Sequence, residues 1–222
     1  LMIALTFFLV RFCLIVPAFQ TEEHYTGIYP EHSSRMEFML LTAVTLCIAA
    51  AGYVINDVFD VTSDAVNKPG RNLFETRIKK RTGKIIFFAL SGFGALAGFT
   101  LGMRIQKPTV AFIPAFTGFS LWMYASYYKR RLLSGNLLIA ALSGLMVILP
   151  GLYEPSFYPN ILYLLIYGAF AFLLSFAREV IKDVEDIDGD ERMQCKTFPI
   201  RYGVNASKAL ISIFLVLTAT SI

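Results

Sequence analysis

The chain has 222 residues, of which 56% are hydrophobic and only 16% are charged. A soluble domain of this length usually has about 45–50% apolar and about 25% charged residues, so the composition argues against a water-soluble globular protein. The net charge is a modest +4, and we predict no nucleic-acid partner. The three cysteines share no close spacing, so neither a disulfide framework nor a zinc site is predicted.

The charged residues are clustered, and long apolar runs separate the clusters. A helix that crosses the hydrocarbon core needs about 20 mostly apolar residues. Residues 1–19 form a first run, interrupted only by Arg11. Five runs without Asp, Glu, Lys or Arg follow, and a seventh apolar run begins near the end of the chain: 38–55, 85–103, 108–128, 132–153, 155–177 and then 209–222. Because these runs lack the alternation of barrel strands, we predict an all-α, polytopic transmembrane helical bundle.

The ends of the sequence affect how these runs are counted. The first residue is Leu and the last apolar run is short, so we expect a longer protein that is truncated here at both ends. Residues 1–19 have no preceding basic region and no small-residue cleavage site, which favours a transmembrane helix over a signal peptide. No linker or low-complexity segment divides the chain, so we predict a single membrane domain over residues 1–222.

Lys and Arg are concentrated in alternate loops. The loops at 57–84, 129–131 and 178–208 are rich in them, whereas the intervening loops contain one, two and none. The positive-inside rule places the rich loops in the cytoplasm, together with the N-terminus. We predict a multi-pass protein of the cell inner membrane whose active site faces the cytoplasm.

Two acidic clusters share the pattern D-x-x-D-x-x-x-D and begin 126 residues apart: Asp57, Asp60 and Asp64, and then Asp183, Asp186 and Asp190. Residues at i, i+3 and i+7 lie on one face of a helix, so each cluster forms a stripe of carboxylates at the cytoplasmic end of a span. Ionisable residues in a span indicate a functional site. Since such a stripe repels itself, we expect multivalent cations to bind there.

The ligand chemistry favours Mg²⁺. The candidate metal ligands are the six carboxylates, with the amide of Asn56 beside them, and neither His residue lies near a cluster in the sequence. Oxygen ligands suit Mg²⁺, Ca²⁺ or Mn²⁺, and Mg²⁺ usually binds through one or two carboxylates plus phosphates and waters. The pattern therefore predicts a diphosphate site that includes Asn56 and basic side chains that neutralise the diphosphate: Lys68, Arg71, Lys129, Arg130, Arg178 and Lys182.

Simpler roles for the basic residues stay open. Juxtamembrane Lys and Arg are commonly orientation signals and lipid head-group contacts. Arg178 and Lys182 could form plain salt bridges to Asp183 or Asp186.

Both acidic motifs resemble the signatures of the UbiA-type intramembrane prenyltransferases. The first reads N-D-x-x-D-x-x-x-D-x-x-N-K-P-x-R from Asn56 to Arg71, and the second reads R-E-x-x-K-D-x-x-D-x-x-G-D from Arg178 to Asp190. Residues 127–136 are similar to the family's middle loop. The resemblance covers nearly the whole chain and implies a bundle of about nine spans around a central cavity, with six complete spans and one partial span here.

The resemblance implies Mg²⁺-dependent transfer of a prenyl group from a polyprenyl diphosphate to an acceptor, in contact with membrane lipid. It assigns the catalytic role to four carboxylates: Asp57, Asp60, Asp183 and Asp186. Tyrosines that could line the cavity are Tyr53, Tyr124, Tyr127 and Tyr128. The forms of both motifs are most similar to the branch whose acceptor is geranylgeranylglyceryl phosphate. The alternative is an aromatic acceptor of the 4-hydroxybenzoate or naphthoate type.

Two other classes fit the pattern less well. CDP-alcohol phosphotransferases also have paired Asp motifs, but theirs are compact and contain an Asp-Gly step, whereas Val61 follows Asp60 here. A cation transporter would have its carboxylates near the bilayer midplane, and would have little use for Lys68 and Arg71 beside them.

Overall fold

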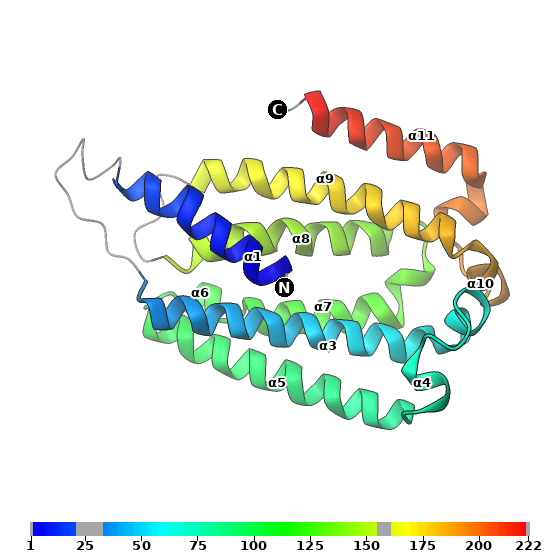
Figure 1. Ribbon diagram of the computed structural model, residues 1–222, viewed down its shortest axis with the longest axis horizontal. Helices are drawn as coiled ribbons and strands as arrows, with labels where there is room; N and C mark the ends of the chain where they lie inside the picture. Colours follow the sequence, from blue (N-terminus) through cyan, green and yellow to red (C-terminus); the bar gives the residue numbers. More distant parts are fainter. Residues whose placement is uncertain (1, 21–32, 155–160, 221–222) are drawn as a thin grey trace.

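The computed structural model describes residues 2–20, 33–154 and 161–220, and the regular elements in these ranges are all helical. Long helices run alongside one another, and short helices lie at both ends of the bundle (Figure 1). In chain order the elements are α1 (Met2–Leu9), the π-helical segment η1 (Val10–Ile15), α3 (Arg35–Asn67), α4 (Leu73–Thr76), α5 (Lys80–Arg104), α6 (Pro108–Ala111), α7 (Ile113–Ser126), the 3-10 turn η2 (Tyr128–Arg130), α8 (Ser134–Leu152), α9 (Ile161–Glu185), α10 (Ile187–Arg192) and α11 (Phe198–Thr220).

Six helices in the described ranges are long and apolar enough to cross a membrane: Met2–Gln20, Arg35–Asn67, Lys80–Arg104, Ser134–Leu152, Ile161–Glu185 and Phe198–Thr220. Large apolar side chains such as Phe88, Phe93 and Leu96 are exposed along α5, a surface that lipid rather than water would cover. The prediction of an all-α, polytopic membrane bundle is confirmed, and the protein is an integral membrane protein.

Two predicted spans differ in extent from the observed helices. The run 108–128 is divided into α6 and the 14-residue α7, with Pro108 and Pro114 in the first turns of the two helices. Neither is among the six described helices long enough to cross a membrane, so the prediction of one complete span over 108–128 is wrong. Proline lacks a backbone N–H and its ring blocks the preceding turn, so it begins helices rather than continuing them. The run 209–222 belongs to α11, which begins earlier in a more polar segment and is kinked at Gly203, where φ is +84°. Residues 155–160 and 221–222 of the predicted runs lie outside the described residues.

Small residues let α5 approach its neighbours closely, as the glycines in its sequence predict. A Cβ atom at Gly98 would lie 2.4 Å from Pro114 Cγ, and one at Gly102 would lie 2.5 Å from Ala111 Cα. A Cβ at Gly94 would lie 2.7 Å from Ile48 Cδ1 of α3. At Gly92, by contrast, a Cβ would meet nothing within 4 Å.

We therefore expect Gly102→Ala to destabilise the protein by about 1–3 kcal/mol, because the added methyl group meets backbone atoms of α6 that cannot rotate away. Thermal denaturation of the purified protein in detergent should show the lower Tm. Gly92→Ala is the matched control in the same helix, and its helix propensity predicts an unchanged or slightly higher Tm. Equal Tm values for the two variants would contradict this account of the packing.

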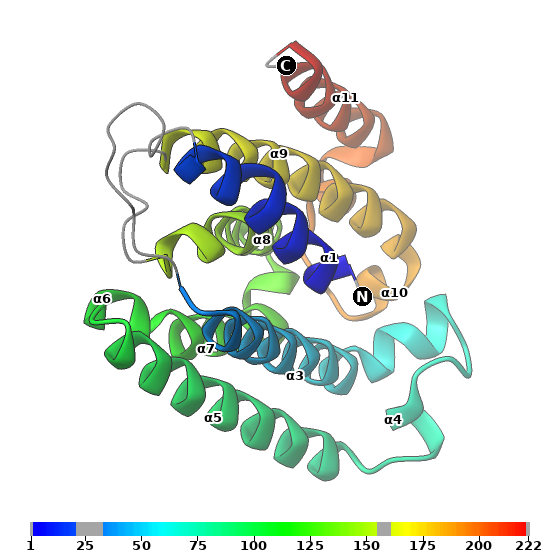
Figure 2. The same cartoon turned by 60° about the vertical axis from the view of Figure 1, so that its left-hand side comes forward.

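A buried polar network holds η1 at the end of the bundle opposite α4 and α10. Figure 2 shows the N-terminal helix running from α1 toward that end. Arg11 Nη1 lies 2.8 Å from Glu154 Oε1 and 2.7 Å from Ser33 Oγ. The backbone N–H of Ser33 donates to Glu154 Oε2 at 2.6 Å, and Lys107 Nζ donates to the Leu152 carbonyl oxygen at 3.1 Å. Glu154 is only 1% exposed and Arg11 is 8% exposed. This network joins η1 to the segment just before α3 and to the segment just after α8.

Candidate active site

The two acidic motifs meet at one end of the bundle. The first lies on the last turns of α3, and the second spans the end of α9 and the short α10. Helices α4 and α10 lie together at that end (Figure 1). The turn η2, which separates α7 from α8, brings Lys129 to the same end. All three loops rich in Lys and Arg therefore contribute to this end of the structure.

Asn67 and Lys68 connect the first motif directly to the second. Asn67 Oδ1 accepts a hydrogen bond from the backbone N–H of Gly189 at 2.8 Å, and its Nδ2 donates to the Asp186 carbonyl oxygen at 3.2 Å. Lys68 Nζ forms an ion pair with Asp186 Oδ1 at 3.0 Å. A Cβ at Gly189 would lie 2.4 Å from Asn67 Nδ2, so this contact requires a glycine. Residues about 120 positions apart are thus held in fixed register.

Lys129 is the central cation of the site. Its Nζ pairs with the carboxylate of the buried Asp60, which also accepts a hydrogen bond from Asn56 Nδ2 at 2.6 Å. Burial alone lowers the pKa of Lys129, but the carboxylates of Asp60, Asp190 and Asp186 outweigh it and raise the pKa above its ordinary value. Lys129 is therefore charged at physiological pH.

At the second motif, burial and neighbouring carboxylates disfavour the charged form of Asp190. Burial raises the pKa of Asp190 to about 6; Lys129 opposes that effect, while Asp186 and Asp60 add to it. Carboxylates from both motifs therefore repel one another across the site. An additional cation would relieve that repulsion.

Amide side chains orient the other carboxylates. Asn136 Nδ2 of α8 donates to Asp183 Oδ2 at 2.8 Å. Asn72 Nδ2 donates to Asp64 Oδ2 and to the Asp57 carbonyl oxygen, both at 2.8 Å. Sequence reasoning missed Asn72. The available signal was its position as the residue that caps α4, where its side-chain oxygen accepts from the Phe74 N–H.

The remaining predicted residues occupy the edge of the site. Asp57 is exposed and Asp64 is half-buried. Arg71 and Arg130 are exposed and form no ion pair with any residue that the structure describes. Lys182 lines the cavity described next.

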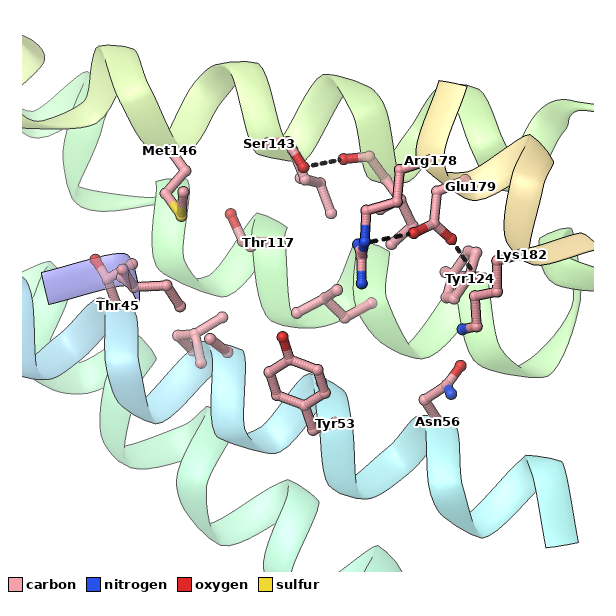
Figure 3. A pocket seen from close by; sticks show the side chains of 17 residues that line it. Thr45, Tyr53, Asn56, Thr117, Tyr124, Ser143, Met146, Arg178, Glu179 and Lys182 are labelled. Atoms are coloured by element: carbon pink, nitrogen blue, oxygen red, sulfur yellow. Dashed lines mark hydrogen bonds and ion pairs between the residues drawn. The ribbon is translucent and has the colours of Figure 1, made fainter. Parts of the chain in front are cut away.

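A cavity of about 270 Å³ extends from the acidic end into the bundle between α3, α7, α8 and α9 (Figure 3). Its polar end is formed by Asn56, Tyr124, Arg178, Glu179 and Lys182. Farther in, the walls are mostly apolar, with side chains that include Ile3, Ile48, Leu121, Ile139, Leu142 and Met146. The cavity thus has one charged end and one long apolar part, a shape suited to an amphipathic lipid.

Glu179 anchors the polar end of this cavity. It is 5% exposed, and its Oε2 accepts a hydrogen bond from the Tyr124 hydroxyl at 3.3 Å while its Oε1 accepts one from Arg178 at 3.2 Å (Figure 3). Tyr53 and Tyr124 line the cavity as predicted. Tyr127 and Tyr128 instead pack against each other, with ring centroids 5.3 Å apart.

The donor atoms fit a metal that binds together with a phosphate ligand. Within the described ranges, no three His, Cys, Asp or Glu side chains converge closely enough to form a metal cage by themselves. Asn56 Oδ1, however, is buried beside Asp60 and has no hydrogen-bond partner among the described residues. Mg²⁺ commonly uses one or two carboxylates and completes its shell with phosphates and waters. The oxygen-rich site and its unpaired acceptor agree with that mode of binding.

Comparison with known proteins gives one consistent family. The family model described as the UbiA prenyltransferase family matches residues 27–222. The chain is 32% identical over 84% of its length to a digeranylgeranylglyceryl phosphate synthase of Methanothermobacter thermautotrophicus, of which it covers 64%. It is 35% identical over 81% of its length to the protein of the same name from Saccharolobus solfataricus, of which it covers 62%.

A solved structure agrees with these sequence matches. The structure, described as digeranylgeranylglyceryl phosphate synthase in membranes, is similar with a TM-score of 0.62 and 27% sequence identity, covering 85% of this chain and 64% of that one. The chain thus spans less than two thirds of the length of these relatives.

Proposed function

Because the chain belongs to the UbiA prenyltransferase family, we propose that it transfers a prenyl group from a polyprenyl diphosphate to geranylgeranylglyceryl phosphate in a Mg²⁺-dependent reaction. One observation carries this proposal: two Asp motifs from distant parts of the chain converge beside the polar end of a mostly apolar cavity. Proteins of this family are generally metal-dependent. The relatives are named for their product, digeranylgeranylglyceryl phosphate, and geranylgeranylglyceryl phosphate is the acceptor that would give it.

In the proposed reaction, the bond between the first prenyl carbon and the diphosphate oxygen breaks. A new ether bond forms between that carbon and the acceptor hydroxyl oxygen, whose proton is released together with the diphosphate. Bound Mg²⁺ would neutralise the charge that grows on the departing diphosphate. The ligands proposed for it are the six Asp carboxylates of the two motifs, Asp57, Asp60, Asp64, Asp183, Asp186 and Asp190, with Asn56 beside them.

The chain's own residues would supply the rest of the stabilisation. Lys129 and Lys68 are held in place by Asp60 and Asp186, and Arg71 and Arg130 stand at the edge, so positive charge surrounds the proposed diphosphate position. Fixed charges of this kind stabilise a transition state without having to reorganise. Tyr53 and Tyr124 line the cavity, where aromatic rings would stabilise positive charge on the prenyl group.

We also propose that this end of the bundle faces the cytoplasm, in the cell inner membrane. The three basic loops lie at this end, while the opposite end contributes few Lys or Arg residues outside the buried network. The positive-inside rule then gives the orientation. Water-soluble Mg²⁺ and diphosphate would enter and leave from that side.

The test is diphosphate release from labelled geranylgeranyl diphosphate by the full-length protein in detergent, with lipid products separated in parallel. With geranylgeranylglyceryl phosphate and Mg²⁺, we expect a doubly prenylated ether lipid and one diphosphate per product molecule. Chelation of Mg²⁺ by EDTA should stop product formation and diphosphate release, because without Mg²⁺ the carboxylates would repel the diphosphate. Added Mg²⁺ should restore both activities. Product formation with 4-hydroxybenzoate or a naphthoate alone would change the acceptor class, and metal-independent turnover would contradict the Mg²⁺ assignment.

A further inference from the structure

The basic residues near the two motifs fall into two groups. Lys68 and Lys129 are bonded to carboxylates of the motifs themselves. Arg178 contacts neither motif's aspartates; its one ion pair among the described residues is with Glu179, at 3.2 Å. The sequence pattern assigned all of these cations to the diphosphate, but Arg178 lies in a different part of the site.

Arg178 faces the cavity instead of the carboxylates. It precedes Asp183 by five residues on α9, which places it about 7.5 Å farther along the helix axis toward the middle of the bundle. Tyr53 of α3 likewise precedes Asp57 by four residues, or about 6 Å. Figure 3 shows the Arg178 guanidinium and the Tyr53 hydroxyl directed into the same part of the cavity from opposite walls. Both side chains therefore stand between the motifs and the apolar part of the cavity.

The ion pair with Glu179 does not account for Arg178. The Arg178 side chain is 72% exposed, and an ion pair so open to solvent contributes little to stability. Only Nη1 of its guanidinium makes a hydrogen bond among the described residues, and a guanidinium has five N–H donors. Glu179 keeps its hydrogen bond from the Tyr124 hydroxyl when Arg178 turns toward a ligand. A planar guanidinium with available donors matches a phosphate group.

The proposed reaction brings two phosphate-bearing lipids to one site, and the two groups need separate places. We infer that Arg178, with Tyr53 opposite it, binds the phosphomonoester of the acceptor lipid, while the Asp motifs with Lys68 and Lys129 hold the donor diphosphate. This inference rests on the proposed function. It assigns acceptor selection to Arg178, which precedes the first proposed metal ligand of its motif, Asp183, by five residues.

The test is a comparison of steady-state constants for Arg178→Gln and the unchanged full-length protein in neutral detergent. We expect the KM for geranylgeranylglyceryl phosphate to rise between about 10-fold and 100-fold, as for loss of a charge-assisted hydrogen bond. The KM for geranylgeranyl diphosphate should stay within about twofold, and Arg178→Lys should recover part of the acceptor affinity. Geranylgeranylglycerol lacks the phosphate, so the unchanged protein should transfer a prenyl group to it only slowly. Arg178→Gln should not lower that rate further.

Arg104→Gln is the matched control. Arg104 is 76% exposed and pairs with Glu37 at 3.2 Å, so its side-chain exposure and ion-pair distance match those of Arg178, but it lies at the opposite end of the bundle. Its constants should be unchanged. An increase in the KM for the donor alone would overturn the inference and indicate that Arg178 binds the diphosphate. Unchanged constants for both substrates would also overturn it and indicate a structural role.

Two further measurements distinguish acceptor binding from the binding of bulk anionic lipid and from a lack of prenyl transfer. Phosphatidylglycerol added to the micelles should not compete with the acceptor; competition that Arg178→Gln abolishes would assign the site to bulk anionic lipid and overturn the inference. Failure of the unchanged protein to use any acceptor would instead remove the proposed function itself, which is a distinct result.

Discussion

Asp60→Asn is expected to reduce prenyl transfer by at least about 10²–10³-fold, the loss that accompanies removal of one preorganised charged group. Asp60 is 9% exposed and bonds both Lys129 and Asn56. The amide keeps the shape of the carboxylate but removes its charge. Lys129 then loses its partner, and the proposed Mg²⁺ loses a ligand. The rate is measured as diphosphate release at saturating donor and acceptor.

Asp188→Asn is the control for this change. Asp188 lies between Asp186 and Asp190 on α10 but is exposed to solvent, so the same substitution there should leave the rate within about twofold, as expected at the surface. Both variants should elute and melt as the unchanged protein does. Near-normal turnover by a folded Asp60→Asn variant would remove Asp60 from the metal site.

The second large effect concerns stability. Arg11→Met is expected to destabilise the protein by about 3–5 kcal/mol, because it leaves the charge of Glu154 buried and without its arginine. Glu154 is 1% exposed, at the end of the bundle opposite the motifs. Unfolding in mixed micelles with increasing SDS, followed by circular dichroism, gives the free energy.

A double substitution separates the ion pair from the surrounding packing. Arg11→Met combined with Glu154→Leu removes both charges, so we expect it to be more stable than either single variant. Arg104→Gln breaks an exposed ion pair and should cost no more than about 1 kcal/mol. If Arg11→Met lowers the free energy of unfolding no more than Arg104→Gln does, the network does not hold η1 in place.

Many features of the fold follow from local sequence. A membrane helix satisfies its own backbone hydrogen bonds, so a sufficiently long apolar run is enough to predict it. The run 108–128 is the exception. Pro108 and Pro114 lack a backbone N–H, so they interrupt the helical hydrogen bonding, which a count of apolar residues does not register. Hydropathy measures only the transfer to lipid, and it does not register where a helix must begin.

The candidate site was predicted in part. Periodicity placed Asp57, Asp60 and Asp64 on one helix face, and the alternation of basic loops placed both motifs at one end. The sequence pattern did not indicate Asn72. Its amide follows the turn after α3 and donates hydrogen bonds to Asp57 and Asp64 of the first motif. An asparagine has no charge and no periodic pattern, so nothing in the sequence distinguishes this one from an ordinary helix cap.

The sequence by itself therefore determined most of the membrane helices, the two acidic motifs and the family, because each depends on residues close together in the chain. Only the tertiary structure decided that Arg11 pairs with Glu154, that Lys129 pairs with Asp60, and that Arg178 faces the cavity. The physical reason is distance. Ion pairs and hydrogen bonds act over a few ångströms, and the separations of these groups are set by how closely the helices pack, which small residues on several helices control together.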